Sequence, residues 1–155
     1  MRNMVHTVYV AVIGGAEVSP HLYALAREVG REIARRGAAL LCGGLGGVMA
    51  AAAQGVKEAG GVSLGILPDG DRRRANPYLT YSIATNLGHA RNMLLAHSAD
   101  ALIAVDGGYG TISEAAIALK LGKPVIGLKV AWDLPGLIRA ADPGEAVALA
   151  LDGRG

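Results

Sequence analysis

Short apolar segments alternate with helical segments along this chain, and glycines follow three of the apolar segments directly or after one residue. The first, residues 8–13, is a continuous apolar and β-branched run that stops at Gly14 and Gly15, and a helical pattern follows from Pro20. A continuous apolar run is typical of a strand with both faces covered, as in a parallel sheet. Repeated strand, turn and helix units therefore predict an α/β fold, Rossmann-like and doubly wound, with a mainly parallel sheet and helices on both faces.

The same pattern gives the bounds of the other expected elements. Strands are expected over residues 8–13, 38–41, 62–67, 81–84, 101–105 and 124–128. Helices are expected from Pro20 to Gly37, over residues 48–59, 87–97 and 112–121, and after Pro143, with a proline-bounded loop over residues 68–77. Because 155 residues is close to the length of one typical domain and no linker interrupts the chain, we expect a single domain over residues 1–155.

Glycines gather where the strands end. In a doubly wound sheet, ligands bind beyond the carboxyl ends of the strands, where the winding direction reverses. Glycine allows a ligand close to the backbone, and a helix N-terminus presents amide donors to an anion; alternatively, the glycines only permit tight turns and close helix packing. Three such loops at one edge favour a phosphate or nucleotide ligand. The glycines concerned are Gly14, Gly15, Gly43, Gly44, Gly46, Gly47, Gly107, Gly108 and Gly110.

These loops do not match the standard nucleotide-binding fingerprints. Residues 44–49 lack the third glycine of G-x-G-x-x-G, and the chain contains no G-K-[ST] sequence of a P-loop. The sequence therefore argues against an ordinary NAD-dependent dehydrogenase and against a P-loop NTPase.

Glu114 and Arg91 each have two open interpretations. Thr111 and Glu114 have the T-x-x-E spacing of a capping box, in which the threonine caps a helix and the glutamate reaches back to the cap's amide. Alternatively, the Glu114 carboxylate lies at the ligand edge and polarises a water or binds a ribose. Arg91 is either a solvated arginine on the polar face of its helix or a ligand contact.

Other polar residues receive no role in the predicted site. The three arginines at residues 72–74 form a charge run that we expect to be solvated. His89 and His97 have no carboxylate or cysteine at ligand spacing, so we expect them to be structural or surface residues. Cys42 is expected to be a small buried residue rather than a nucleophile.

Composition excludes several classes of protein. A net charge of +2 with 4% aromatic residues argues against a nucleic-acid-binding surface. No apolar run approaches the roughly 20 residues that cross a bilayer, so we expect no membrane association and a cytoplasmic location. One cysteine and four histidines predict no metal site, and no cofactor is expected. Since 52% of the residues are hydrophobic and residues 115–121 form a helix of mainly small and aliphatic side chains, we expect a homodimer or tetramer.

Together these motifs resemble the LOG family, cytokinin-activating nucleoside 5'-monophosphate phosphoribohydrolases formerly labelled lysine decarboxylases. That family has G-G-x-x-G-x-M after the second strand, an R-K pair in mid-chain and P-G-G-x-G-T-x-x-E before a later helix. The matching residues here are Gly43, Gly44, Gly47 and Met49, then Arg91, then Gly107, Gly108, Tyr109, Gly110, Thr111 and Glu114. Asn92 replaces the lysine and Asp106 replaces the proline, features that resemble a divergent branch similar to the molybdenum cofactor carrier proteins.

The resemblance implies two alternative functions. As an enzyme, the protein would use Arg91 and Glu114 to cleave the base from a nucleoside 5'-monophosphate without a metal, while the glycine loops, Met49, Tyr109 and Thr111 bind the ligand. As a carrier, it would hold a phosphate-bearing ligand such as molybdenum cofactor without turnover, which Asn92 and Asp106 favour. Lysine decarboxylation is not expected, because pyridoxal-phosphate chemistry needs a Schiff-base lysine and none follows a glycine-terminated strand.

Overall fold

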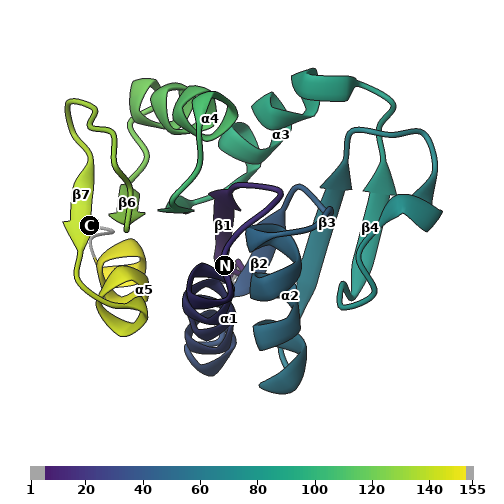
Figure 1. Cartoon of the computed structure of the whole chain (residues 1–155), viewed down its shortest axis with the longest axis horizontal. Coiled ribbons are helices and arrows are strands. Elements are labelled where there is room, and N and C mark those ends of the chain that lie inside the picture. The colour runs from purple at the N-terminus through teal and green to yellow at the C-terminus, as the bar shows by residue number, and fades with distance from the viewer. Residues whose placement is uncertain (1–5, 153–155) are drawn as a thin grey trace, which may run out of the picture.

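A seven-stranded sheet, parallel throughout, forms the centre of the computed structural model, which describes residues 6–152. The predicted domain, residues 1–155, extends beyond these residues at both ends. The strand order is β4-β3-β2-β1-β5-β6-β7 (Figure 1). The strands are β1 (Tyr9–Gly14), β2 (Ala39–Cys42), β3 (Ser63–Leu67), β4 (Tyr81–Ala84), β5 (Ala101–Val105), β6 (Val125–Leu128) and β7 (Ile138–Ala140). The chain builds outward from β1 to β4 and then crosses to the other side of β1 at β5, which confirms the doubly wound prediction.

Helices cover both faces of the sheet. They are α1 (Pro20–Arg35), α2 (Val48–Glu58), α3 (Arg91–Ser98), α4 (Tyr109–Lys120) and α5 (Pro143–Asp152), with the 3-10 turns η1 (Arg72–Arg74) and η2 (Gly88–Ala90). Figure 1 shows α3 and α4 on one side of the sheet and α1, α2 and α5 on the other. Along β1, Val10 and Val12 enter one core cluster and Ala11 and Ile13 the other, the alternation expected of a strand. No helix within residues 6–152 is both long and apolar enough to cross a membrane.

Helix α1 begins where the sequence predicts. The Ser19 Oγ accepts a hydrogen bond from the Leu22 N–H at 3.2 Å, and Pro20 occupies the first helical position. An ideal Cβ on Gly30 would lie 2.0 Å from the Ala52 carbonyl oxygen. The backbones of α1 and α2 therefore approach more closely than side chains at this position would allow.

Four elements differ from the sequence prediction. Strand β7 is absent from the prediction because its three residues are largely exposed and do not form an apolar run. The loop over residues 68–77 contains η1, and the helix predicted over residues 87–97 is divided into η2 and α3. Helix α4 begins at Tyr109 rather than at Ile112. This earlier start matters because it moves the first helical turn to the ligand edge.

Candidate functional site

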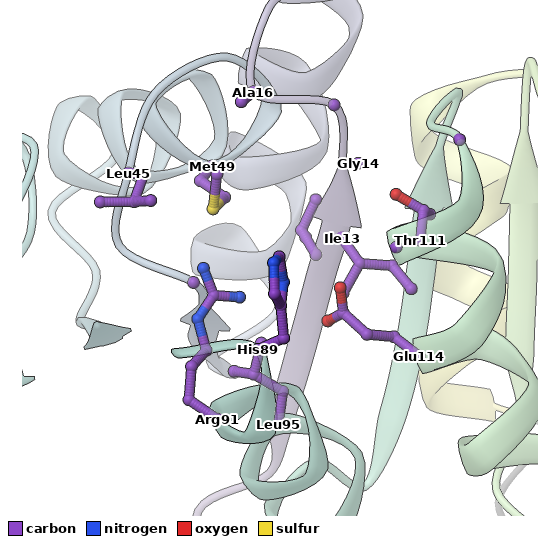
Figure 2. A pocket seen from close by; sticks show the side chains of 15 residues that line it. Ile13, Gly14, Ala16, Leu45, Met49, His89, Arg91, Leu95, Thr111 and Glu114 are labelled. Atoms are coloured by element: carbon purple, nitrogen blue, oxygen red, sulfur yellow. The ribbon is translucent and has the colours of Figure 1, made fainter. Parts of the chain in front are cut away.

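A cavity of about 290 Å³ opens at the carboxyl end of β1, where the winding direction of the sheet reverses. The loops after β1 and β2, η2, α3 and the start of α4 all contribute to its walls (Figure 2). The lining residues are Val12, Ile13, Gly14, Gly15, Ala16, Gly43, Leu45, Met49, His89, Arg91, Leu95, Gly108, Gly110, Thr111 and Glu114. The fold thus brings the three predicted glycine loops to one cavity.

Close packing requires glycine at two positions of these loops. An ideal Cβ on Gly14 would lie 2.5 Å from the Val105 carbonyl oxygen and 2.7 Å from Cγ2 of Val48. Gly47 has a φ of +62°, and its Cβ would lie 2.2 Å from the Gly15 carbonyl oxygen. That oxygen also accepts a hydrogen bond from the Val48 N–H at 3.0 Å. The loops after β1 and β2 therefore touch and form one continuous wall.

The first turn of α4 shows that the capping-box interpretation of Thr111 and Glu114 is wrong. Gly108 occupies the N-cap position, and no side chain caps the helix. Thr111 lies inside the first turn and is 4% exposed, while Glu114 follows in the second turn. The first N–H groups of a helix have no partner within the helix. Since Gly108, Gly110 and Thr111 line the cavity, this helix end presents amide donors to an anion there.

Arg91 extends from the start of α3 across the loop after β2. An ideal Cβ on Gly43 would lie 2.7 Å from both terminal nitrogens of the guanidinium, so only glycine leaves room for the side chain in this position. The Arg91 Nη1 donates a hydrogen bond to the Asn92 Oδ1 at 2.6 Å. The buried Nε has no hydrogen-bond partner within residues 6–152, and Arg91 forms no ion pair there. Arg91 is therefore not a solvated surface arginine.

The charge state of Arg91 follows from its surroundings. Burial lowers its pKa, while the nearby Glu114 carboxylate opposes that effect. Arginine begins from so high a pKa that it stays protonated near neutral pH. The cavity therefore contains a permanent positive charge, and its Nε donor is left without a partner by the described part of the chain.

Glu114 faces this guanidinium from the other side of the cavity. Its side chain is buried, with 7% of the residue exposed, and its Oε2 has no hydrogen-bond partner among the described residues. Burial raises the pKa of Glu114 to about 7, although the positive charge of Arg91 opposes the rise. Figure 2 shows the carboxyl group and the guanidinium reaching into the pocket from opposite sides. The two groups form no ion pair within residues 6–152, and both line the same cavity.

The predicted ligand residues divide into two groups. Nine line the cavity, namely Gly14, Gly15, Gly43, Met49, Arg91, Gly108, Gly110, Thr111 and Glu114. The others, Gly44, Gly46, Gly47, Gly107 and Tyr109, lie outside its lining. Gly44 and Gly107 have φ values of +81° and +94°, so they shape the turns. The Tyr109 side chain points away into solvent and is 92% exposed.

His89 lines the cavity, although its sequence context predicts a structural or surface residue. The residue is exposed, and in the view of Figure 2 its ring lies between Arg91 and Glu114. The one sequence signal was its position two residues before Arg91. The apolar side chains of Leu45 and Leu95 complete the lining and carry no signal beyond hydrophobicity.

The predictions for Cys42, His97 and the arginines at residues 72–74 are confirmed. Cys42 is fully buried, and burial raises its pKa to about 11, so it is not a reactive thiol at neutral pH. His97 is exposed, and the arginines at residues 72–74 are exposed on η1. Within residues 6–152, no group of three or more histidine, cysteine, aspartate or glutamate side chains is arranged to hold a metal ion.

Both departures from the LOG pattern have structural consequences. Asp106 has a φ of +53°, which proline cannot adopt because its ring fixes φ near −65°. The turn after β5 therefore takes a path that a proline would exclude, and the Trp132 Nε1 donates a hydrogen bond to the Gly107 carbonyl oxygen there at 3.2 Å. Asn92 supplies a neutral acceptor beside Arg91 where the family has a second cation.

Comparison with known proteins finds a matching family and a similar protein over nearly the whole chain. The model of the SLOG cluster4 family matches residues 7–150. An uncharacterized protein of Archaeoglobus fulgidus is 49% identical over 138 residues, which are 89% of this chain and 91% of that protein.

Two solved structures are similar in both sequence and fold. The molybdenum cofactor binding protein of the phototrophic bacterium Rippkaea orientalis has a TM-score of 0.88 and 34% identity, covering 94% of this chain and 96% of that one. The molybdenum cofactor carrier protein of Chlamydomonas reinhardtii also has a TM-score of 0.88 and 34% identity, with coverages of 95% and 98%. From the family match and these similarities, the chain belongs to the SLOG cluster4 family of LOG-like proteins.

Proposed function

We propose that this protein binds a phosphate-bearing small molecule and carries it without chemical change, with the molybdenum cofactor as the leading candidate. The observation that carries the proposal is the half-buried Arg91 guanidinium, which has an unpartnered Nε and lies across a glycine-lined cavity from the start of α4. Guanidinium groups and helix N-terminal amides are both strong donors to phosphate oxygens. The two similar structures described as binding or carrying molybdenum cofactor support this ligand class.

Glu114 is compatible with an anionic ligand despite being acidic. Because its pKa is about 7, a large fraction of the carboxyl group is protonated at neutral pH. A protonated carboxyl group donates a hydrogen bond to a ligand oxygen, whereas a carboxylate would repel it. The cavity therefore offers donors on both sides of the ligand.

A second candidate function is hydrolysis of a nucleoside 5'-monophosphate to free base and ribose 5-phosphate. The observation that favours it is the same unpartnered Glu114 oxygen inside the cavity. When ionised, this carboxylate can activate a water or stabilise the positive charge that develops on the sugar carbon as the base leaves. Arg91 would hold phosphate or ribose oxygens meanwhile.

Titration calorimetry with molybdenum cofactor and a panel of nucleoside 5'-monophosphates, together with an assay for free base, tests both candidates. We expect binding without release of base. Arg91→Ala should weaken binding roughly 10- to 150-fold, or about 1.5–3 kcal/mol, the usual scale for a charge-assisted hydrogen bond. Arg74→Ala is the matched control, since Arg74 is exposed on η1 and lies outside the cavity lining.

Two outcomes would change the assignment. Unchanged affinity in Arg91→Ala would contradict the proposed binding site. Release of base by the unmodified protein, lost in Glu114→Gln while affinity is kept, would establish the hydrolase instead.

A further inference from the structure

A second cavity, of about 220 Å³, adjoins the first at the same edge of the sheet. Its lining residues are Leu45, Pro68, Gly88, His89 and Arg91. Pro68 directly follows β3, so this cavity extends from the switch point toward the β3 side of the sheet. Leu45, His89 and Arg91 line both cavities, which places these three side chains at the boundary.

The two cavities differ in the chemistry of their walls. The first contains the glycine loops and the amide donors at the start of α4, which suit a phosphate. The second has no carboxylate in its lining and combines the apolar side chains of Leu45 and Pro68 with the imidazole of His89 and the guanidinium of Arg91. Flat heterocyclic rings stack on imidazole and guanidinium planes and pack against apolar side chains. The second cavity therefore suits a ring better than a phosphate.

His89 is placed to contact such a ring. It lies on η2 directly after Gly88, whose φ is +58°, and the space around Gly88 is open. The imidazole has no hydrogen bond or ion pair within residues 6–152, so the fold itself makes no use of it there. Figure 2, which draws the side chains that line the first cavity, shows the ring directed into that cavity, and the same residue also lines the second.

We propose that the two cavities form one two-part site for a phosphorylated heterocycle, with the phosphate in the first cavity and the ring in the second against His89. This inference rests on the proposed function, to which it adds a subsite for the ring and a specificity-determining residue. Three side chains, those of Leu45, His89 and Arg91, line both cavities, so a ligand in one lies next to the other.

A comparison of GMP with ribose 5-phosphate tests the two-part site by calorimetry. GMP carries a flat heterocyclic base on a phosphorylated ribose, and ribose 5-phosphate lacks any base. We expect GMP to bind at least about tenfold more tightly, because base stacking on an aromatic side chain is worth about that much. His89→Ala should weaken GMP binding about five- to tenfold and leave ribose 5-phosphate unchanged, while His89→Phe, which keeps a ring, should stay within about twofold of the unmodified protein.

His97→Ala is the matched control, because His97 is an exposed histidine of α3 outside both cavities. It should change neither affinity. Equal binding of GMP and ribose 5-phosphate, or an equal effect of His89→Ala on both, would overturn the two-part site and leave the phosphate site standing. Binding of neither compound would overturn this inference, and the proposed function falls as well if molybdenum cofactor also fails to bind.

Discussion

Glu114 and Arg91 are two ionisable residues that each have one buried polar atom, Oε2 and Nε respectively, with no hydrogen-bond partner within the described part of the chain. Burying such atoms without partners costs stability, and proteins retain this kind of cost mainly at functional sites. The two groups also face each other without forming an ion pair, which would have reduced the cost. At the scale of residues, this arrangement is more consistent with a site that awaits a ligand than with one that stabilises the fold.

The pH dependence of stability tests the burial of Glu114. Its folded-state pKa of about 7 lies above the unfolded value of roughly 4.3, so its contribution to stability is fully present below pH 4 and is lost as the pH rises to 7. Glu114→Gln cannot ionise, so it should raise the free energy of unfolding at pH 8 by up to about 3 kcal/mol and change it little at pH 4. Urea unfolding at both pH values measures this difference.

The exposed Glu17 supplies the control for that experiment. Glu17→Gln should change the free energy of unfolding equally, and only slightly, at the two pH values. A Glu114→Gln effect that is the same at pH 4 and pH 8 would show that the carboxyl group is not buried as described.

Gly43→Ala tests whether the Arg91 guanidinium must lie against the loop after β2. The new methyl group would lie 2.7 Å from both terminal guanidinium nitrogens, so the arginine has to move. We expect GMP affinity to fall about tenfold or more, since a displacement of about 1 Å in a positioned group has large effects. When Arg91 is already alanine, Gly43→Ala should have little further effect on GMP affinity. Calorimetry of the unmodified protein, the two single variants and the double variant gives the coupling free energy between the two positions. Additive effects would contradict the contact.

At the scale of elements, the start of α4 decides what this edge of the sheet offers to a ligand. The T-x-x-E pattern suggests a helix capped by Thr111, but the left-handed conformations of Asp106 and Gly107 turn the chain so that the helix begins at Tyr109. The first turn is consequently glycine-rich and uncapped by side chains. A threonine cap would have used one of the amide donors that the cavity presents instead.

The contact between α1 and α2 gives a prediction at the same scale. A Cβ on Gly55 would lie 1.9 Å from the Arg27 carbonyl oxygen, so Gly55→Ala should lower the free energy of unfolding by about 3 kcal/mol or more as the helices are forced apart. Gly110→Ala is the control, because no atom lies within 4 Å of that Cβ and alanine favours a helix. Urea unfolding should show loss of stability only in Gly55→Ala; similar effects in both variants would contradict the close helix contact.

At the scale of the whole molecule, the sheet is not covered evenly. On β4, Tyr81 and Ile83 are 64% and 49% exposed, although a doubly wound sheet normally buries both faces of its strands. They share a face with their register partners on β3, Leu64 and Ile66. Exposed apolar surface of this kind often marks an interface, and the composition of the chain is hydrophobic. We therefore still predict self-association.

We expect a homodimer or tetramer in solution. Light scattering at high micromolar concentration should give at least twice the 15.8 kDa mass of the chain. Ile83→Glu tests the exposed face of β4, and Ala116→Glu tests the exposed face of α4. Either change should reduce association if its surface is the interface, because a charge in an interface core disfavours association. A monomeric unmodified protein would contradict the prediction.

The sequence alone determined most elements and the edge at which a site would form. Continuous apolar runs indicate strands that are covered on both faces. Glycines soon after such runs indicate turns in which the backbone lies close to another segment or to a ligand. These are local signals, so β1, β2, β3, β4, β5 and β6 were predicted within about one residue of their observed bounds. The short, exposed β7 has no such signal.

Only the tertiary structure decided which residues share the cavity and what each does there. Gly43, Arg91 and Glu114 come from three different loops and helices, and their meeting depends on strand order and crossovers that no local pattern encodes. The burial that raises the pKa of Glu114 and the position of His89 between two cavities depend on the same long-range packing. The periodicity of a sequence indicates whether a side chain is buried. The chemical role of that side chain depends on which residues from distant parts of the chain lie against it.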